Sequence, residues 1–241
     1  MPPVPSESES ESENESSIAI EVTPFSLDEE SVLPLALARS WLSKEELERA
    51  AAFRFEVHRD RYVRGRGMVR ALLARRLGGD PGSLAFALGE KGKPSLVGVQ
   101  TGFNLSHSEG RAVLAIGPVE HLGVDIEGYD RRVDHAGLAR RCFRDSEIAW
   151  MERFTPDERH LAFFRIWTSK EARMKATGEG FQLAPQRIEL EFADGFAVRC
   201  LEPVDPPAHL VAVKLPDEGA ACAVVAMVPI HVVLGEVPSW G

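Results

Sequence analysis

The strongest constraint on the fold is an order of elements that occurs twice along the chain. Helical patterns over residues 43–77 are followed by short strand patterns that end near Ile126. Helical patterns return over residues 134–177, and further strand patterns follow them. Helices that precede a run of strands predict an α+β fold. The repetition, at a spacing of about 110 residues, predicts two similar halves at residues 18–127 and 128–241.

Short local signals mark where two of the predicted helices begin. Ser43 and Glu46 have the spacing of a capping box, in which each side chain binds the other residue's N–H group. Thr155 and Glu158 have the same spacing and would begin a long helix that Gly178 ends. The two signals therefore predict one helix in each half.

A basic helix is predicted over residues 57–77. The wider region 39–76 has eleven basic and five acidic side chains, a balance that suits anion binding. Gly65 and Gly67 flank Arg66 in this helix, although each glycine costs a helix about 1 kcal/mol relative to alanine. The two glycines predict a close approach by a ligand or by another helix.

The N-terminal 17 residues alternate serine and glutamate and contain few apolar side chains. Such a segment cannot bury enough surface to offset its ordering entropy, so residues 1–17 are predicted to be a disordered tail. The first 30 residues hold nine acidic side chains and no basic one, and the remainder of the chain has no net charge despite the total of −9.

Composition also favours a cytoplasmic location. Three widely spaced cysteines without a CxxC pattern favour a reducing compartment and argue against a disulfide scaffold. No apolar run approaches the roughly 20 residues that a membrane-spanning helix needs. The N-terminus lacks the basic and apolar regions of a signal peptide.

The segment Gly-Val-Asp-Ile-Glu presents two carboxylates on one predicted strand. Because alternate strand residues point the same way, Asp125 and Glu127 share one side. Two carboxylates this close repel each other unless a cation or a donor lies between them. Oxygen ligands suit Mg²⁺, often shared with a substrate phosphate. Two solvated charges at a strand end are the alternative.

Two further segments carry polar groups that suit phosphate. Ser106 and His107 are adjacent, so they do not suit a nucleophile and its base, and Ser106 lacks the flanking glycines of a nucleophile elbow. Contacts to a phosphate fit this pair better, and a polar turn is the alternative. Lys93 lies in a Gly-Lys-Pro turn that lacks the upstream glycine and the following Ser or Thr of a P-loop.

The long helix of the second half carries Trp167, Lys170, Glu171 and Lys175 at helical spacing. An acid and two lysines one turn apart can serve a phosphate-and-metal site. The simpler interpretation is a surface salt bridge between Glu171 and Lys175, worth about 0.2–0.5 kcal/mol. The stretch alone does not decide between these interpretations.

The order of four motifs is more specific than any one of them. Gly-Lys-Pro, Phe-Asn-Leu-Ser-His, Gly-Val-Asp-Ile-Glu and Trp-Thr-Ser-Lys-Glu follow one another, and the chain from about Arg49 to Phe181 resembles the Sfp-type 4′-phosphopantetheinyl transferases. The resemblance implies a pseudo-dimer of two similar α+β halves with the active site between them. It implies transfer of the phosphopantetheine arm of coenzyme A to a serine of apo acyl or peptidyl carrier proteins, with release of adenosine 3′,5′-bisphosphate.

The resemblance also implies roles for particular residues. Mg²⁺ would be held by Asp125, Glu127 and Glu171, and Glu171 is also a candidate general base. Asp125, Glu171 and Lys175 form the implied catalytic group. Contacts to coenzyme A phosphates are implied for Lys93, Ser106, His107 and Lys175, and contacts to its 3′-phosphate for Arg49 and Arg66.

Some implications concern partners and alternatives. The two-half length of the resembled family implies a monomer with a broad range of carriers. The carrier can belong to fatty-acid, polyketide or nonribosomal peptide synthesis, and the sequence does not decide among them. No nucleic acid or membrane is expected as a partner. The acidic tail is not part of the family pattern. A non-catalytic coenzyme A or carrier-binding module and a metal-dependent nucleotide phosphohydrolase are the alternative functions.

Overall fold

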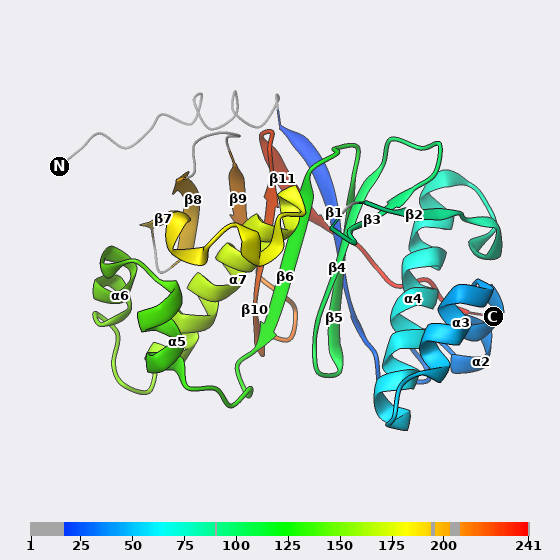
Figure 1. The fold of residues 1–241 in the computed structure, drawn as a ribbon, viewed down its shortest axis with the longest axis horizontal. Coiled ribbons are helices and arrows are strands. Elements are labelled where there is room, and N and C mark those ends of the chain that lie inside the picture. The colour runs from blue at the N-terminus through cyan, green and yellow to red at the C-terminus, as the bar shows by residue number, and fades with distance from the viewer. Residues whose placement is uncertain (1–16, 90, 194–195, 203–207, 241) are drawn as a thin grey trace.

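Two β-sheets lie face to face in the centre of the molecule, and helices cover the outer side of each (Figure 1). The computed structural model describes residues 17–89, 91–193, 196–202 and 208–240. The described helices are α2 (Leu35–Trp41), α3 (Lys44–Ala51), α4 (Glu56–Leu77), α5 (His135–Cys142), α6 (Asp145–Met151) and α7 (Arg159–Thr177). The described strands are β1 (Ile18–Ser26), β2 (Phe86–Leu88), β3 (Pro94–Leu96), β4 (Gly102–Ser108), β5 (Arg111–Gly117), β6 (Leu122–Gly128), β7 (Glu189–Ala193), β8 (Phe196–Glu202), β9 (His209–Ala212), β10 (Ala220–Ala226) and β11 (Ile230–Leu234). The mixture confirms the α+β class.

The sheet order explains how the two layers meet. One sheet has the order β11-β1-β5-β4, the other has the order β6-β10-β9, and β2-β3 and β7-β8 are separate hairpins. β11 runs parallel to β1, whereas the other pairs in both sheets are antiparallel. β4 and β6 are therefore the edge strands of different sheets.

Three apolar clusters hold the layers together. Alternation along β5 sends Leu114 towards α4 and its neighbour Val113 towards the second sheet. β10 does the same, because Ala223 packs with α7 and Val224 packs between the sheets. Each sheet is thus buried on both faces, which explains the continuous apolar run of β10.

Local sequence signals located one helix start correctly and another wrongly. The capping box of Ser43 and Glu46 is confirmed at the start of α3. The predicted helix start at Thr155 was wrong: its hydroxyl donates to the Glu158 carboxylate, at 2.7 Å, and α7 begins at Arg159. The patterns also missed α2, β3 and β11, since these are short elements that tertiary contacts stabilise.

Three broader predictions concern the N-terminal tail, membrane-spanning helices and the boundary between the two halves. The predicted tail lies outside the described residues except for Ser17. In the part of the chain that the structure describes, no helix is long and apolar enough to cross a lipid bilayer. Pairing crosses the predicted boundary between residues 127 and 128, because β6 joins β10 and β11 joins β1.

The two glycines of α4 are expected to respond oppositely to alanine. A Cβ on Gly67 would lie 2.6 Å from the Ala38 Cβ of α2, whereas a Cβ on Gly65 would find Leu27 at 3.5 Å. We expect Gly67→Ala to destabilise the protein by about 1–3 kcal/mol through overpacking. Gly65→Ala should stabilise it by up to about 1 kcal/mol through helix propensity. Urea unfolding measures both, and equal stability of the two variants would contradict the close α2–α4 contact.

Candidate active site

The strand β6 lies unusually close to α7. A Cβ on Gly123 would lie 2.1 Å from the carbonyl oxygen of Ala172 and 2.5 Å from the backbone nitrogen of Ala176. A side chain at this position would therefore separate the strand from the helix. Two residues further along β6, the carboxylate of Asp125 meets the ammonium group of Lys175 across this contact.

Asp125 lies at the centre of a buried polar group. Its Oδ1 accepts from Lys175 Nζ at 2.5 Å and from Ser106 Oγ at 2.8 Å. Lys175 Nζ also donates to Ser106 Oγ at 2.9 Å. Burial raises the pKa of Asp125, and the ammonium of Lys175 acts against that shift. The other oxygen, Oδ2, is buried and has no hydrogen-bond partner among the described residues.

Glu127 is held from two sides. Its Oε2 accepts from the hydroxyl of Ser108 at 2.7 Å, and its Oε1 pairs with the guanidinium of Arg131. Burial raises the pKa of Glu127, and the negative charge of Asp125 adds to this shift. The two carboxylates therefore share one side of β6, as the strand period predicted.

Glu171 lies within the electrostatic field of both carboxylates. Burial raises its pKa to about 7, and the charges of Asp125 and Glu127 add to this shift. Lys175, one helical turn along α7, acts in the opposite direction. The three acids that the sequence singled out thus gather in one region, where they repel one another in the absence of a cation.

The donor chemistry of this region suits a hard divalent cation, although no compact ligand set is formed. Within the described ranges, no three His, Cys, Asp or Glu side chains are close enough to hold a metal ion. Instead Lys175 and Arg131 neutralise Asp125 and Glu127. The buried and unpartnered Asp125 Oδ2 is the type of oxygen that Mg²⁺ binds.

A cleft of about 600 Å³ lies between Glu127 and α4. Arg66 and His107, both sequence candidates, line it together with Glu127. Arg61 and Arg131 line it as well. The cleft therefore joins basic side chains, which suit phosphate groups, to the acidic region of β6.

Comparison with known proteins identifies the family. The chain is 35% identical over 193 residues to 4′-phosphopantetheinyl transferase HetI of Nostoc sp., covering 76% of this chain and 77% of that protein. The chain belongs to the 4′-phosphopantetheinyl transferase family. A model of the 4′-phosphopantetheinyl transferase superfamily matches residues 121–225. The transferase is also 28% identical over 184 residues to Sfp of Bacillus subtilis (76% and 75% covered) and 39% identical over 110 residues to AcpT of Salmonella typhimurium (45% and 56% covered).

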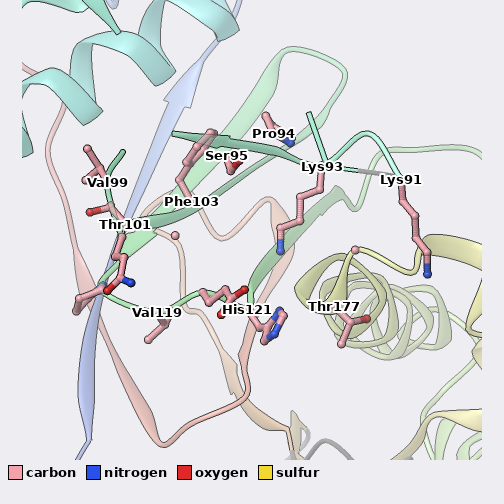
Figure 2. Close-up of a pocket in the computed structure, with 16 residues that line it drawn as sticks. Lys91, Lys93, Pro94, Ser95, Val99, Thr101, Phe103, Val119, His121 and Thr177 are labelled. Atoms are coloured by element: carbon pink, nitrogen blue, oxygen red, sulfur yellow. The ribbon is translucent and has the colours of Figure 1, made fainter. Parts of the chain in front are cut away.

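Lys93 of the transferase lies apart from the carboxylates. Its Nζ donates to the carbonyl oxygens of Leu122 at 3.0 Å and Ala176 at 2.7 Å, and so ties β6 to the end of α7. Burial lowers its pKa to about 8. Lys93 lines a cavity of about 830 Å³, around which Figure 2 shows Lys91, Lys93 and Thr177. With these two partners among the described residues, one N–H of its ammonium group remains for a ligand.

The other basic candidates are also engaged in the transferase. Arg66 pairs with Glu46 at 2.6 Å, so the capping residue of α3 also fixes an arginine of the cleft. Arg49 lies over the ring of Tyr62, 5.8 Å from its centre. Lys170 faces away from the three acids of the candidate site. It is fully buried and pairs with Glu147 at 2.7 Å. Its place is structural, since it joins α7 to α6.

The sequence did not single out three residues that line or support the candidate site. Arg61 lies in the predicted basic helix, but only Arg66 of that helix was assigned a role, and Arg131 and Ser108 were not singled out. Arg61 binds Asp28 through two hydrogen bonds of 2.7 Å at the edge of the cleft. The alternation of Ser106 and Ser108 on β4, matched to Asp125 and Glu127 on β6, was the available signal for Ser108.

Proposed function

We propose that this transferase moves the 4′-phosphopantetheine arm of coenzyme A to a serine hydroxyl of an apo acyl or peptidyl carrier protein. The meeting of Asp125, Lys175 and Ser106 beside Glu171 is the observation that carries the proposal. Basic groups suit the pyrophosphate of coenzyme A, and the cleft lined by Arg66 and His107 suits its nucleotide phosphates.

The reaction is a phosphoryl transfer. The serine oxygen bonds to the phosphorus that carries the pantetheine arm, and the bond from that phosphorus to the bridging oxygen breaks. Adenosine 3′,5′-bisphosphate leaves with this oxygen and its electron pair. Catalysis of such a step relies on positioning and on stabilisation of charge at the phosphate oxygens.

The residues of the chain divide this work. The ammonium group of Lys175 stabilises the negative charge of the pyrophosphate. Glu171 accepts the proton of the carrier serine. A pKa of about 7 suits a general base near neutral pH. Mg²⁺ held by Asp125, Glu127 and Glu171 would, when bound, neutralise charge on the pyrophosphate oxygens.

The arrangement of elements supports a pseudo-dimer with the active site between its halves. α4 with the first sheet and α7 with the second sheet are comparable layers, and β4 and β6 lie side by side where these layers meet (Figure 1). Both layers belong to one chain, so we propose that a monomer forms the complete site.

Mass spectrometry of an apo carrier protein tests the function directly. We expect incubation with this protein, coenzyme A and Mg²⁺ to add one phosphopantetheine group to the carrier. Boiled protein and a carrier whose acceptor serine is replaced by alanine are the controls. Coenzyme A binding without a mass shift would favour a non-catalytic module, and nucleotide release without a carrier would favour a phosphohydrolase.

A further inference from the structure

The edge strands β4 and β6 are joined by side chains instead of a backbone ladder. They belong to different sheets, yet alternate N–H groups of β6 donate to side-chain oxygens of β4. The pairs are Val124 to Asn104 (2.9 Å), Ile126 to Ser106 (3.4 Å) and Gly128 to Ser108 (3.2 Å). β4 thus holds the strand that carries the acidic residues at three successive points.

Two of these three side chains also touch a carboxylate. A serine hydroxyl has one proton and two lone pairs. The Ser108 hydroxyl accepts from Gly128 N–H, and its proton goes to Glu127 Oε2 at 2.7 Å. Ser106 makes the corresponding contact with Asp125, whereas the Asn104 side chain, in the described part of the chain, binds only the backbone of Val124.

Ser108 is the better shielded of the two contacts to Glu127. Ser108 is 6% exposed, and Glu127, which it binds, is 8% exposed. The side chain of Arg131, which holds the other oxygen, is 44% exposed and competes with water. The orientation of the Glu127 carboxylate therefore depends mainly on Ser108.

We propose that Ser108 is a positioning residue that orients Glu127 to bind a divalent cation together with Asp125 and Glu171. The inference rests on the proposed function, because that function gives the three acids a common metal. Each carboxylate oxygen has two lone pairs, so a bond from Ser108 leaves Glu127 able to coordinate a cation.

Direct titration with Mn²⁺, followed by its electron paramagnetic resonance signal, tests this role. Full-length wild type, Ser108→Ala and Asn104→Ala are compared with and without coenzyme A. Both variants lose the hydrogen bond that a backbone N–H of β6 donates to a side chain of β4. Ser108→Ala also loses the bond to Glu127, so it alone releases a carboxylate. We expect the Mn²⁺ dissociation constant to rise by about 10- to 100-fold in Ser108→Ala, as for other residues that orient metal ligands. Asn104→Ala should stay near the wild-type value.

The transfer assay and thermal unfolding supply a second readout. High Mg²⁺ should restore much of the transfer rate of Ser108→Ala, and it should not change Asn104→Ala, if positioning is correct. Wild-type Mn²⁺ affinity in folded Ser108→Ala, or equal losses in both variants, would overturn the proposal. Wild type that binds no Mn²⁺ would overturn it too. The carrier mass shift, measured separately on wild type, then shows whether the transferase function itself stands.

Discussion

Asp125→Asn is expected to lower the rate of phosphopantetheine transfer by about 10²- to 10³-fold, the range seen when one charge-stabilising group is removed from an active site. Asparagine keeps the shape of the side chain and an oxygen that accepts from Lys175 and Ser106. The substitution removes the negative charge that would bind a cation at the pyrophosphate. The rate of carrier modification, measured by chromatography at saturating coenzyme A, gives the size of the effect.

The same variant is expected to remain folded. Burial already disfavours the ionised form of Asp125, as its raised pKa indicates, so a neutral side chain is compatible with its surroundings. Asp130→Asn is a suitable control, because the Asp130 side chain is 75% exposed and its pairing with Arg111 contributes little. Near-normal transfer by folded Asp125→Asn would contradict the assignment of this site.

The features that could be predicted from the sequence are those that nearby residues determine. The capping box of Ser43 and Glu46 involves residues three apart, and the strand period places Asp125 and Glu127 on one side. Gly178 ends α7 in a left-handed conformation, with φ of 73°, as a helix C-cap glycine is expected to do. Each signal lies within one element, so it can be recognised without the fold.

The features that could not be predicted depend on partners far apart in the chain. The parallel pairing of β11 with β1 joins the two ends of the described chain, and no local pattern specifies that partner. The sequence likewise shows a basic group at Lys93, but not that its ammonium binds the carbonyl oxygens of Leu122 and Ala176. Residue type indicates which ligand a side chain can hold, whereas only the fold shows which contacts it already makes.

Glu171→Gln is expected to reduce transfer by about 10²- to 10⁴-fold, the usual contribution of a general base, and to stabilise the folded protein at the same time. The Glu171 pKa rises from 4.5 to about 7 on folding. Between these values the unfolded chain has lost this proton while the folded protein keeps it, so stability falls as the pH rises. Above pH 7 the folded protein carries an ionised, half-buried carboxylate that glutamine would not have.

The variant should therefore exceed wild type in unfolding free energy at pH 8 by about 2 kcal/mol, after allowance for solvent screening. The difference should shrink as the pH falls towards 4.5, and urea unfolding in a chelating buffer measures it. Glu158→Gln is the control, because hydrogen bonds from Thr155 lower the pKa of that exposed carboxyl, so its loss gives no such gain. Added Mg²⁺ should stabilise wild type more than Glu171→Gln, since only wild type keeps all three acids. A stability gain without loss of transfer would show that the raised pKa of Glu171 reflects burial alone and not catalysis.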